Sequence, residues 1–299
     1  MVAPYRGHDP SPTPPLREPI CAIDSDLPAG ASMILAALIA LGLMTLVMSL
    51  AWACVLRTGN GGWTDVFWTF GTGLCGVLAA LAPWSGAPRA RQALVAMLVA
   101  LWAWRLGTYI AVRVARGVED VRYRTLKAEW GERFKPRLLA LALVQAPASA
   151  VLCLSIAAAA ASPGEGLRAT DVLGAAILLI AIGGEALADE QMRRFKAGEH
   201  PPGAVMDRGL WAWSRHPNYF FEWLGWLAYP VIALDLSGGW SAGWLSLLAP
   251  AVMALVLMRL TGVPPLEQAM LAAKGEAYAR YQARVSPFFP RPPRKGSPR

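Results

Sequence analysis

Long apolar segments separated by short polar loops follow one another along the chain from about residue 31. The first, Met33 to Leu56, has no charged residue and exceeds the roughly 20 residues with which a helix crosses about 30 Å of hydrocarbon. Six similar segments follow: Trp63–Trp84, Ala93–Val112, Leu138–Ala161, Val172–Ala188, Tyr219–Leu236 and Trp240–Leu257. The pattern predicts an all-α, polytopic membrane protein with seven transmembrane helices.

The ends of the chain differ from this pattern. Residues 1–30 are rich in proline and too poor in apolar side chains to offset the entropy of ordering, which predicts a disordered tail. Residues 31–290 form the predicted seven-helix membrane domain, and residues 291–299 form a basic tail.

Composition supports the membrane assignment, because 55% of the residues are hydrophobic and only 16% are charged. The formal net charge of +8 comes from blocks between apolar segments, so we expect it to set topology and predict no nucleic-acid partner. The basic blocks are Arg113–Arg137, Arg193–Arg215 and the chain from Arg259 onward. Seven spans place all three on one side, which predicts an N-out, C-in protein of the bacterial inner membrane.

The residues and motifs that form common metal and nucleotide sites are scarce in this sequence. The four cysteines form no CxxC pair and only three histidines occur, so no metal site is expected. There is no GxGxxG or GxxxxGK[ST] motif, which excludes a Rossmann or P-loop site. A nucleotide would therefore have to be bound by the membrane helices themselves.

Charged residues within the apolar segments are functional candidates, because a bare charge in a bilayer is costly. They are Asp65, Arg105, Glu185, Asp189, Glu222 and Asp235. Three of them, the aspartates, lie near segment ends, where a solvated side chain is the simpler interpretation. Glu222 is four residues from both Asn218 and Trp226, so these side chains share one helix face.

Two other helix faces carry polar side chains in steps of four, four and three. They are Arg105, Tyr109, Arg113 and Arg116 on one helix, and Glu185, Asp189, Arg193 and Lys196 on another. Carboxylates at depth and cations at the cytoplasmic end would suit the ribose and phosphates of a nucleotide. The alternative is a helix end with a collar of snorkelling cations.

The segment that carries a family resemblance reads Gly209-Leu-Trp-Ala-Trp-Ser-Arg-His-Pro-Asn-Tyr-Phe-Phe-Glu222. It resembles the signature of bacterial steroid 5-alpha-reductase-like proteins, whose superfamily also contains sterol reductases and isoprenylcysteine carboxyl methyltransferases. Agreement extends from about Gly61 to Pro290 and includes Gly117–Tyr123, Glu185–Phe195 and Gly275–Pro290. The Arg-His-Pro-Asn-Tyr element is shared across the superfamily, so the combination with Asp189 and the Gly117–Tyr123 loop is more specific.

The resemblance implies a seven-helix fold with NADPH bound at the cytoplasmic side, within residues 113–290. The positions that it carries over as cofactor-binding are Arg116, Asp189, Lys196, Arg215, His216, Asn218, Tyr219, Glu222 and Tyr278. Among these, Arg116 and Lys196 match basic positions near the phosphates. The substrate half departs from the steroid reductases: Thr64, Asp65 and Trp102 stand where those enzymes have glutamine, glutamate and tyrosine.

The expected activity is NADPH-dependent reduction of an activated C=C bond, such as an enone, in a lipid or steroid-like substrate that enters from the bilayer. Thr64, Trp102 and Arg105 are the expected substrate-pocket residues, and Asp65 or Glu222 the expected catalytic acid, because the enolate-like transition state needs a proton donor. The expected partners are this lipophilic small molecule and the lipid bilayer, with no obligate protein partner evident.

Two other functions remain open. The Arg-His-Pro element followed by Glu267, Tyr278 and Tyr281 also suits an S-adenosylmethionine-dependent membrane methyltransferase of the isoprenylcysteine type. A non-catalytic, lipid-binding membrane protein is the third possibility. For the Asn218 and Glu222 face, the purely structural interpretation is a helix cap at Asn218 and an ion pair between Glu222 and an arginine such as Arg105.

Overall fold

The computed structural model describes residues 29–235 and 238–293. Within these ranges the chain is helical and has no strand, apart from an isolated bridge between Ser214 and Ser286. The predicted disordered tail lies outside the described residues up to residue 28, as does the basic tail from residue 294.

The first half of the chain supplies most of the long helices. They are α1 (Ala29–Thr58), α2 (Trp63–Leu81), α3 (Arg89–Ala115), α4 (Val121–Trp130), η1 (Gly131–Arg133), α5 (Phe134–Leu143), α6 (Gln145–Ala160) and α7 (Ala169–Ala197). The second half is more broken. It contains η2 (Gly209–Ala212), α8 (Pro217–Trp226), α9 (Ala228–Ala233), η3 (Ser241–Leu247), α10 (Leu248–Leu255), η4 (Val256–Leu260), α11 (Val263–Lys274) and α12 (Glu276–Arg284).

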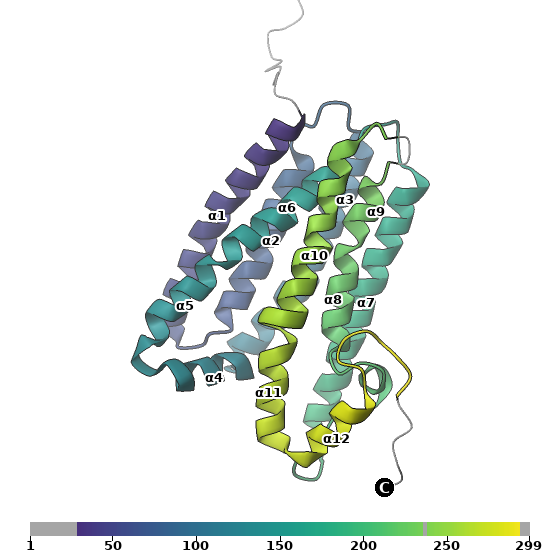
Figure 1. The fold of residues 1–299 in the computed structure, drawn as a ribbon. Coiled ribbons are helices and arrows are strands. Elements are labelled where there is room, and N and C mark those ends of the chain that lie inside the picture. The colour runs from purple at the N-terminus through teal and green to yellow at the C-terminus, as the bar shows by residue number, and fades with distance from the viewer. Residues whose placement is uncertain (1–28, 236–237, 294–299) are drawn as a thin grey trace, which may run out of the picture.

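Six helical segments in the described chain are long and apolar enough to cross a membrane, which identifies a multi-pass membrane protein. They lie in the regions of the first five expected spans and the last one. The remaining expected span, 219–236, corresponds to α8 and α9, which are both short and meet at Leu227. Pro230 has no N–H to donate to the preceding turn, which accounts for the interruption. Figure 1 shows α8 and α9 end to end beside α7.

Glycines on α2 allow close helix packing at the centre of the bundle. A Cβ atom at Gly73 would meet the Cβ of Ala103 on α3, and one at Gly76 would meet Ile156 on α6. Small residues are the usual solution in a membrane, where helices associate by van der Waals contact rather than by the hydrophobic effect. Leucine and isoleucine side chains on α1 are exposed instead, and they form a lipid-facing surface.

One end of the bundle is fastened by a fully buried ion pair. Nε of Arg91, at the start of α3, lies 2.9 Å from Oδ1 of Asp171 in the first turn of α7. The same guanidinium donates to the carbonyls of Ser162 and Gly166 in the loop before α7. This pair joins helices that are far apart in sequence, and its hydrogen bonds satisfy the buried guanidinium.

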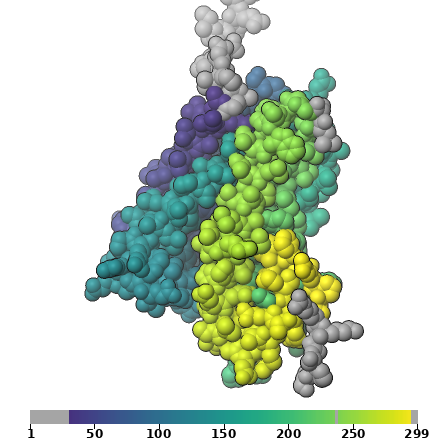
Figure 2. Space-filling model, in the orientation of Figure 1, coloured from purple at the N-terminus to yellow at the C-terminus, as the bar shows by residue number. Residues whose placement is uncertain are grey.

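The opposite end carries α4, α11, α12 and the C-terminal segment (Figure 1). Ser214 and Arg215 hold that segment in place, because the Ser214 hydroxyl donates to the carbonyl of Phe288 and the Arg215 N–H donates to the carbonyl of Ser286. In Figure 2 this yellow region forms one lower corner of the molecule, while the teal region of α4 and α5 forms the other.

Candidate cofactor and substrate site

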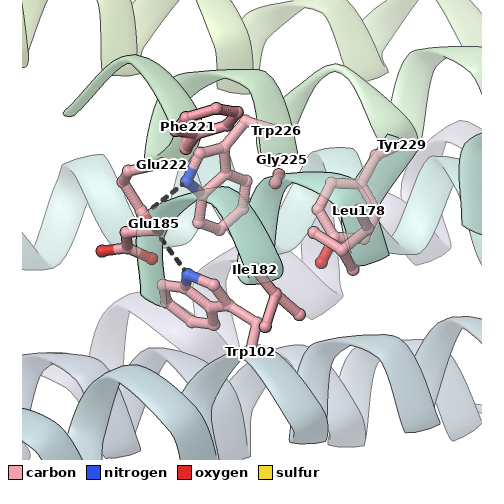
Figure 3. Close-up of a pocket in the computed structure, with 10 residues that line it drawn as sticks. Trp102, Leu178, Ile182, Glu185, Phe221, Glu222, Gly225, Trp226 and Tyr229 are labelled. Carbon is pink, nitrogen blue, oxygen red and sulfur yellow. Dashed lines mark hydrogen bonds between the residues drawn. The ribbon is translucent and has the colours of Figure 1, made fainter. Parts of the chain in front are cut away.

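The centre of the candidate site is the buried carboxyl group of Glu222 on α8. The indole Nε1 of Trp102, on α3, donates to Oε2 at 2.9 Å, and the indole Nε1 of Trp226, one turn further along α8, donates to Oε1 at 2.9 Å. Figure 3 shows both indoles directed at this carboxyl group. The two rings also contact each other edge to face, with centroids 5.2 Å apart. These contacts fix the orientation of the carboxyl group.

Arg105 lies on α3 close to the Trp102 turn and contacts α7. Its guanidinium nitrogens are 2.7 Å from Oε2 of Glu185 and 2.6 Å from Oδ2 of Asp189. The two carboxyl groups are four residues apart, so they share one face of α7. The ion pair that could have joined Arg105 to Glu222 is therefore formed with α7, and Glu222 has indole partners instead. The cluster contains three carboxyl groups and one guanidinium.

A small pocket opens between α3, α7 and α8 (Figure 3). Its polar lining comes from Glu185 and Glu222, and the indoles of Trp102 and Trp226 contribute much of its apolar wall. The cavity volume is about 10 Å³, which is near the roughly 10 to 15 Å³ that a single water molecule needs. A nicotinamide ring or a lipid substrate therefore requires side chains to move.

Asp65 does not line this pocket; it lies in the first turn of α2 and faces α4. Its Oδ2 is 2.9 Å from the guanidinium of Arg122, and its Oδ1 accepts the hydroxyl of Tyr123 at 2.7 Å. A carboxylate paired with a guanidinium is placed as an acceptor rather than as a proton donor. Thr64 is fully buried beside it, and its hydroxyl has no hydrogen-bond partner in the described part of the chain.

Arg215 bonds to the C-terminal region. Its guanidinium contacts both carboxylate oxygens of Glu267 on α11, at 2.5 and 3.0 Å, and donates to the carbonyls of Gln282 and Val285. All of these acceptors belong to the last quarter of the chain. The structure therefore places this predicted cofactor residue at the junction that holds α11 and α12 against α8.

His216 immediately precedes α8 and is almost completely buried. Its Nε2 lies 3.1 Å from Oε1 of Glu267, and its ring stacks on Tyr219 at 5.5 Å. Burial lowers the pKa of His216, and the contact with Glu267 offsets this only in part. Its Nδ1 is buried and has no hydrogen-bond partner among the described residues.

Asn218 lies in the first turn of α8 rather than at its cap, because the helix begins at Pro217. Its side chain is half-buried and makes no hydrogen bond within the described residues. Tyr278, on α12, is buried beside Tyr281, whose hydroxyl donates to the carbonyl of Trp211 at 2.6 Å. Burial raises the pKa of both tyrosines, so both hydroxyls stay protonated near neutral pH.

The two basic residues predicted near the phosphates, Lys196 and Arg116, differ in their surroundings. Lys196, near the end of α7, lies within electrostatic range of Arg113, Arg124 and Asp189. Arg116 is exposed at the end of α3, and no contact of its side chain is recorded in the described structure. The structure thus assembles cations from three helices. Sequence reasoning had placed Arg113 in a helix-face stripe but missed Arg124, which lies just past the Gly117–Tyr123 motif.

Asp120 joins this region to α4. Burial alone would raise the pKa of its carboxyl group, but the bonded guanidinium of Arg122 lowers that pKa to about 2. Arg113 is 3.6 Å from the same carboxylate. The sequence motif Gly117–Tyr123 was the only signal for the roles of Asp120, Arg122 and Tyr123, because their distant partners, Arg113 and Asp65, lie on α3 and α2.

Comparison with known proteins gives one family. Residues 51–285 match the family described as "Protein of unknown function (DUF1295)", so the chain belongs to that family. No curated protein and no solved structure matches the chain.

Proposed function

We propose that this member of the DUF1295 family is a membrane-embedded, NADPH-dependent reductase of an activated C=C bond in a lipid or steroid-like substrate. The observation that carries the proposal is the cluster on α3, α7 and α8. Trp102, Arg105, Asp189 and Glu222 were each singled out from the sequence or from the steroid 5-alpha-reductase-like resemblance, and they form two bonded pairs on these helices. Trp102 donates to Glu222, and both line the pocket, while Arg105 pairs with Asp189 on α7.

The residues around this cluster carry charged and hydrogen-bonding groups that suit NADPH. Lys196 and Arg113 offer cations to phosphate groups, and Nε of Arg113 is a buried donor without a partner in the described chain. The unpartnered Nδ1 of His216 and the amide of Asn218 supply open hydrogen-bonding groups near Tyr219. When bound, NADPH supplies the hydride, and the chain provides binding, orientation and a proton.

Between the two expected catalytic acids, the pocket favours Glu222. Its carboxyl group lines the pocket, whereas Asp65 is paired with Arg122 and Tyr123 at the end of α2. We assign Glu222 to the reacting end of the substrate or to the nicotinamide amide. Asp65 then has a structural role, because it accepts the Tyr123 hydroxyl and pairs with Arg122 where α2 contacts α4.

We further propose seven spans, with α8 and α9 together forming the interrupted one, and an N-out, C-in orientation in a bacterial inner membrane. Support comes from the clustering of α4, α12 and the basic loops at one end of the bundle (Figure 1). A C-terminal alkaline phosphatase fusion should be inactive, and activity in the periplasm would refute the orientation.

The methyltransferase alternative rests on the contacts of Glu267, which accepts from Arg215 and His216 next to Tyr278 and Tyr281. A non-catalytic lipid-binding protein remains the second alternative.

Purified protein should be titrated separately with NADPH, NADH and S-adenosylmethionine, and then supplied with lipophilic enones. NADPH binding that exceeds NADH binding, followed by enone-dependent oxidation of NADPH, supports the reductase. Binding of S-adenosylmethionine alone would replace it with the methyltransferase, and binding of none would favour the lipid-binding protein.

A further inference from the structure

The segment from residue 121 to residue 137, here named the basic elbow, comprises α4, η1 and the first turn of α5. The helix axis turns at Gly131, whose φ of +50° is accessible to glycine at little cost. Figure 1 shows α4 lying across the end of the bundle and α5 leading into it. The basic elbow contains more cations than anions: Arg122, Arg124, Lys127, Arg133, Lys135 and Arg137 against Glu129 and Glu132.

Five of the six cations of the basic elbow fall into two groups, and the sixth, Arg124, is exposed within electrostatic range of Lys196. Arg122 and Lys127 face the protein, where they pair with Asp65 and Glu119. Arg133, Lys135 and Arg137 are exposed, and no carboxylate lies within ion-pair distance of any of them in the described chain. These last three therefore present uncompensated positive charge after the bend, with Arg133 and Arg137 four residues apart on one helix face.

Aromatic side chains fix this surface to the bundle. The guanidinium of Arg137 lies 5.8 Å from the ring centroid of Trp130, and that ring is 6.2 Å from the ring of Phe134. Trp52, on α1, donates its indole N–H to the backbone carbonyl of Lys135 at 2.9 Å. Tryptophan beside exposed cations is typical of the level at which a membrane protein meets lipid headgroups.

The position of the three cations relative to the membrane can be inferred from the exposed side chains of the next two helical turns. Beyond Arg137 the exposed side chains of α5 and α6 become apolar, and Val144 is 63% exposed. Val144 lies seven positions after Arg137, which corresponds to roughly 10 Å of helix at 1.5 Å per residue. On neighbouring α1, Leu56 and Leu50 are exposed as well. The cations therefore lie just outside the apolar surface, at headgroup depth.

We propose that Arg133 and Arg137, which are four residues apart and share one helix face, form a binding site for the headgroup phosphate of an anionic phospholipid, and that Lys135 adds positive charge from a neighbouring face. Guanidinium groups bind phosphate oxygens in pairs, and a lipid with net negative charge compensates cations that the protein leaves unpaired. A zwitterionic lipid carries its own ammonium group and should compete poorly. The proposal depends on the membrane assignment and not on the reductase activity.

The test uses the full chain in nanodiscs that contain phosphatidylcholine with increasing phosphatidylglycerol, and native mass spectrometry counts the lipids that stay bound. We expect selective retention of phosphatidylglycerol by the parent protein, weakened by added salt. At roughly fivefold per cation, a variant with Arg133→Gln, Lys135→Gln and Arg137→Gln should lose on the order of a hundredfold in apparent affinity.

The matched control removes three exposed arginines from the same end of the molecule, by Arg208→Gln, Arg280→Gln and Arg291→Gln. It should keep the parent's selectivity. A separate variant with Arg133→Lys and Arg137→Lys retains the positive charge, so it should keep most of the affinity that the glutamine variant loses. Equal retention by the parent and the basic-elbow variant would overturn the proposal, as would an equal loss in the control. All the changed residues are exposed, so each variant should fold like the parent. Its melting temperature is compared with the parent's before the lipid measurement. Failure of this test leaves the NADPH titration unaffected, so the two proposals are judged separately.

Discussion

The indole Nε1 of Trp102 on α3 donates a 2.9 Å hydrogen bond to Oε2 of Glu222 on α8. The steroid reductase resemblance makes Trp102 an expected substrate residue, and it makes Glu222 an expected cofactor residue. The contact therefore joins the two halves of the proposed site.

We expect Trp102→Phe to leave Oε2 of Glu222 without its donor, at a cost of about 1 to 3 kcal/mol in unfolding free energy. Trp68→Phe is the matched control, because Trp68 packs edge to face on Trp102 at 6.1 Å and its indole N–H has no hydrogen bond in the described residues. Both changes remove similar ring volume. Unfolding in detergent, followed by circular dichroism, should show the larger loss for Trp102→Phe, and equal losses would mean that the hydrogen bond contributes little.

Asn218→Ala and Glu222→Ala should each weaken NADPH binding by roughly one to two orders of magnitude if the two groups hold the nicotinamide. Phe220→Ala should not, because Phe220 points into a different contact set that includes Trp223 and Phe288. Loss of that aromatic packing should lower the melting temperature without NADPH and preserve the shift that NADPH causes. The assignment of α8 to the cofactor is wrong if both polar variants keep the parent's NADPH-induced shift.

The buried pair of Arg91 and Asp171 should dominate stability at its end of the bundle. Arg91→Ala leaves a buried carboxylate without its cation, and we expect a loss of about 3 to 5 kcal/mol. Arg89→Ala removes an exposed arginine two residues away and should change stability by no more than about 0.5 kcal/mol. Denaturation with sodium dodecyl sulfate compares the two, and a similar stability of both variants would contradict the structural role of the pair.

The pH dependence of stability should contain a contribution from His216. Burial lowers its pKa in the folded state, so on acidification the unfolded chain takes up a proton at this position first. Stability is therefore lost as the pH falls below the ordinary histidine value of about 6.5, until the folded-state pKa is reached. His216→Gln should flatten the curve below the ordinary histidine pKa, measured as melting temperature.

Sequence alone determined the helical, membrane-spanning class and most helix positions. Hydropathy and the 3.6-residue period are properties of one segment at a time, so they identify each apolar helix and its polar face. The same locality explains why Glu222, Arg105 and Asp189 were found as candidates. The exception was the predicted span 219–236, which the structure divides into α8 and α9. Hydropathy measures only apolar character, so it does not detect the missing N–H of Pro230.

Only the tertiary structure decided which polar faces meet. Arg105 pairs with Glu185 and Asp189 rather than with Glu222, and Asp65 pairs with Arg122 on α4, outside the pocket lining. Such partners depend on how closely and at what angle helices cross, and glycines such as Gly73 on α2 set that distance through contacts made by residues distant in sequence. A period within one helix contains no information about the neighbour that its polar face will contact.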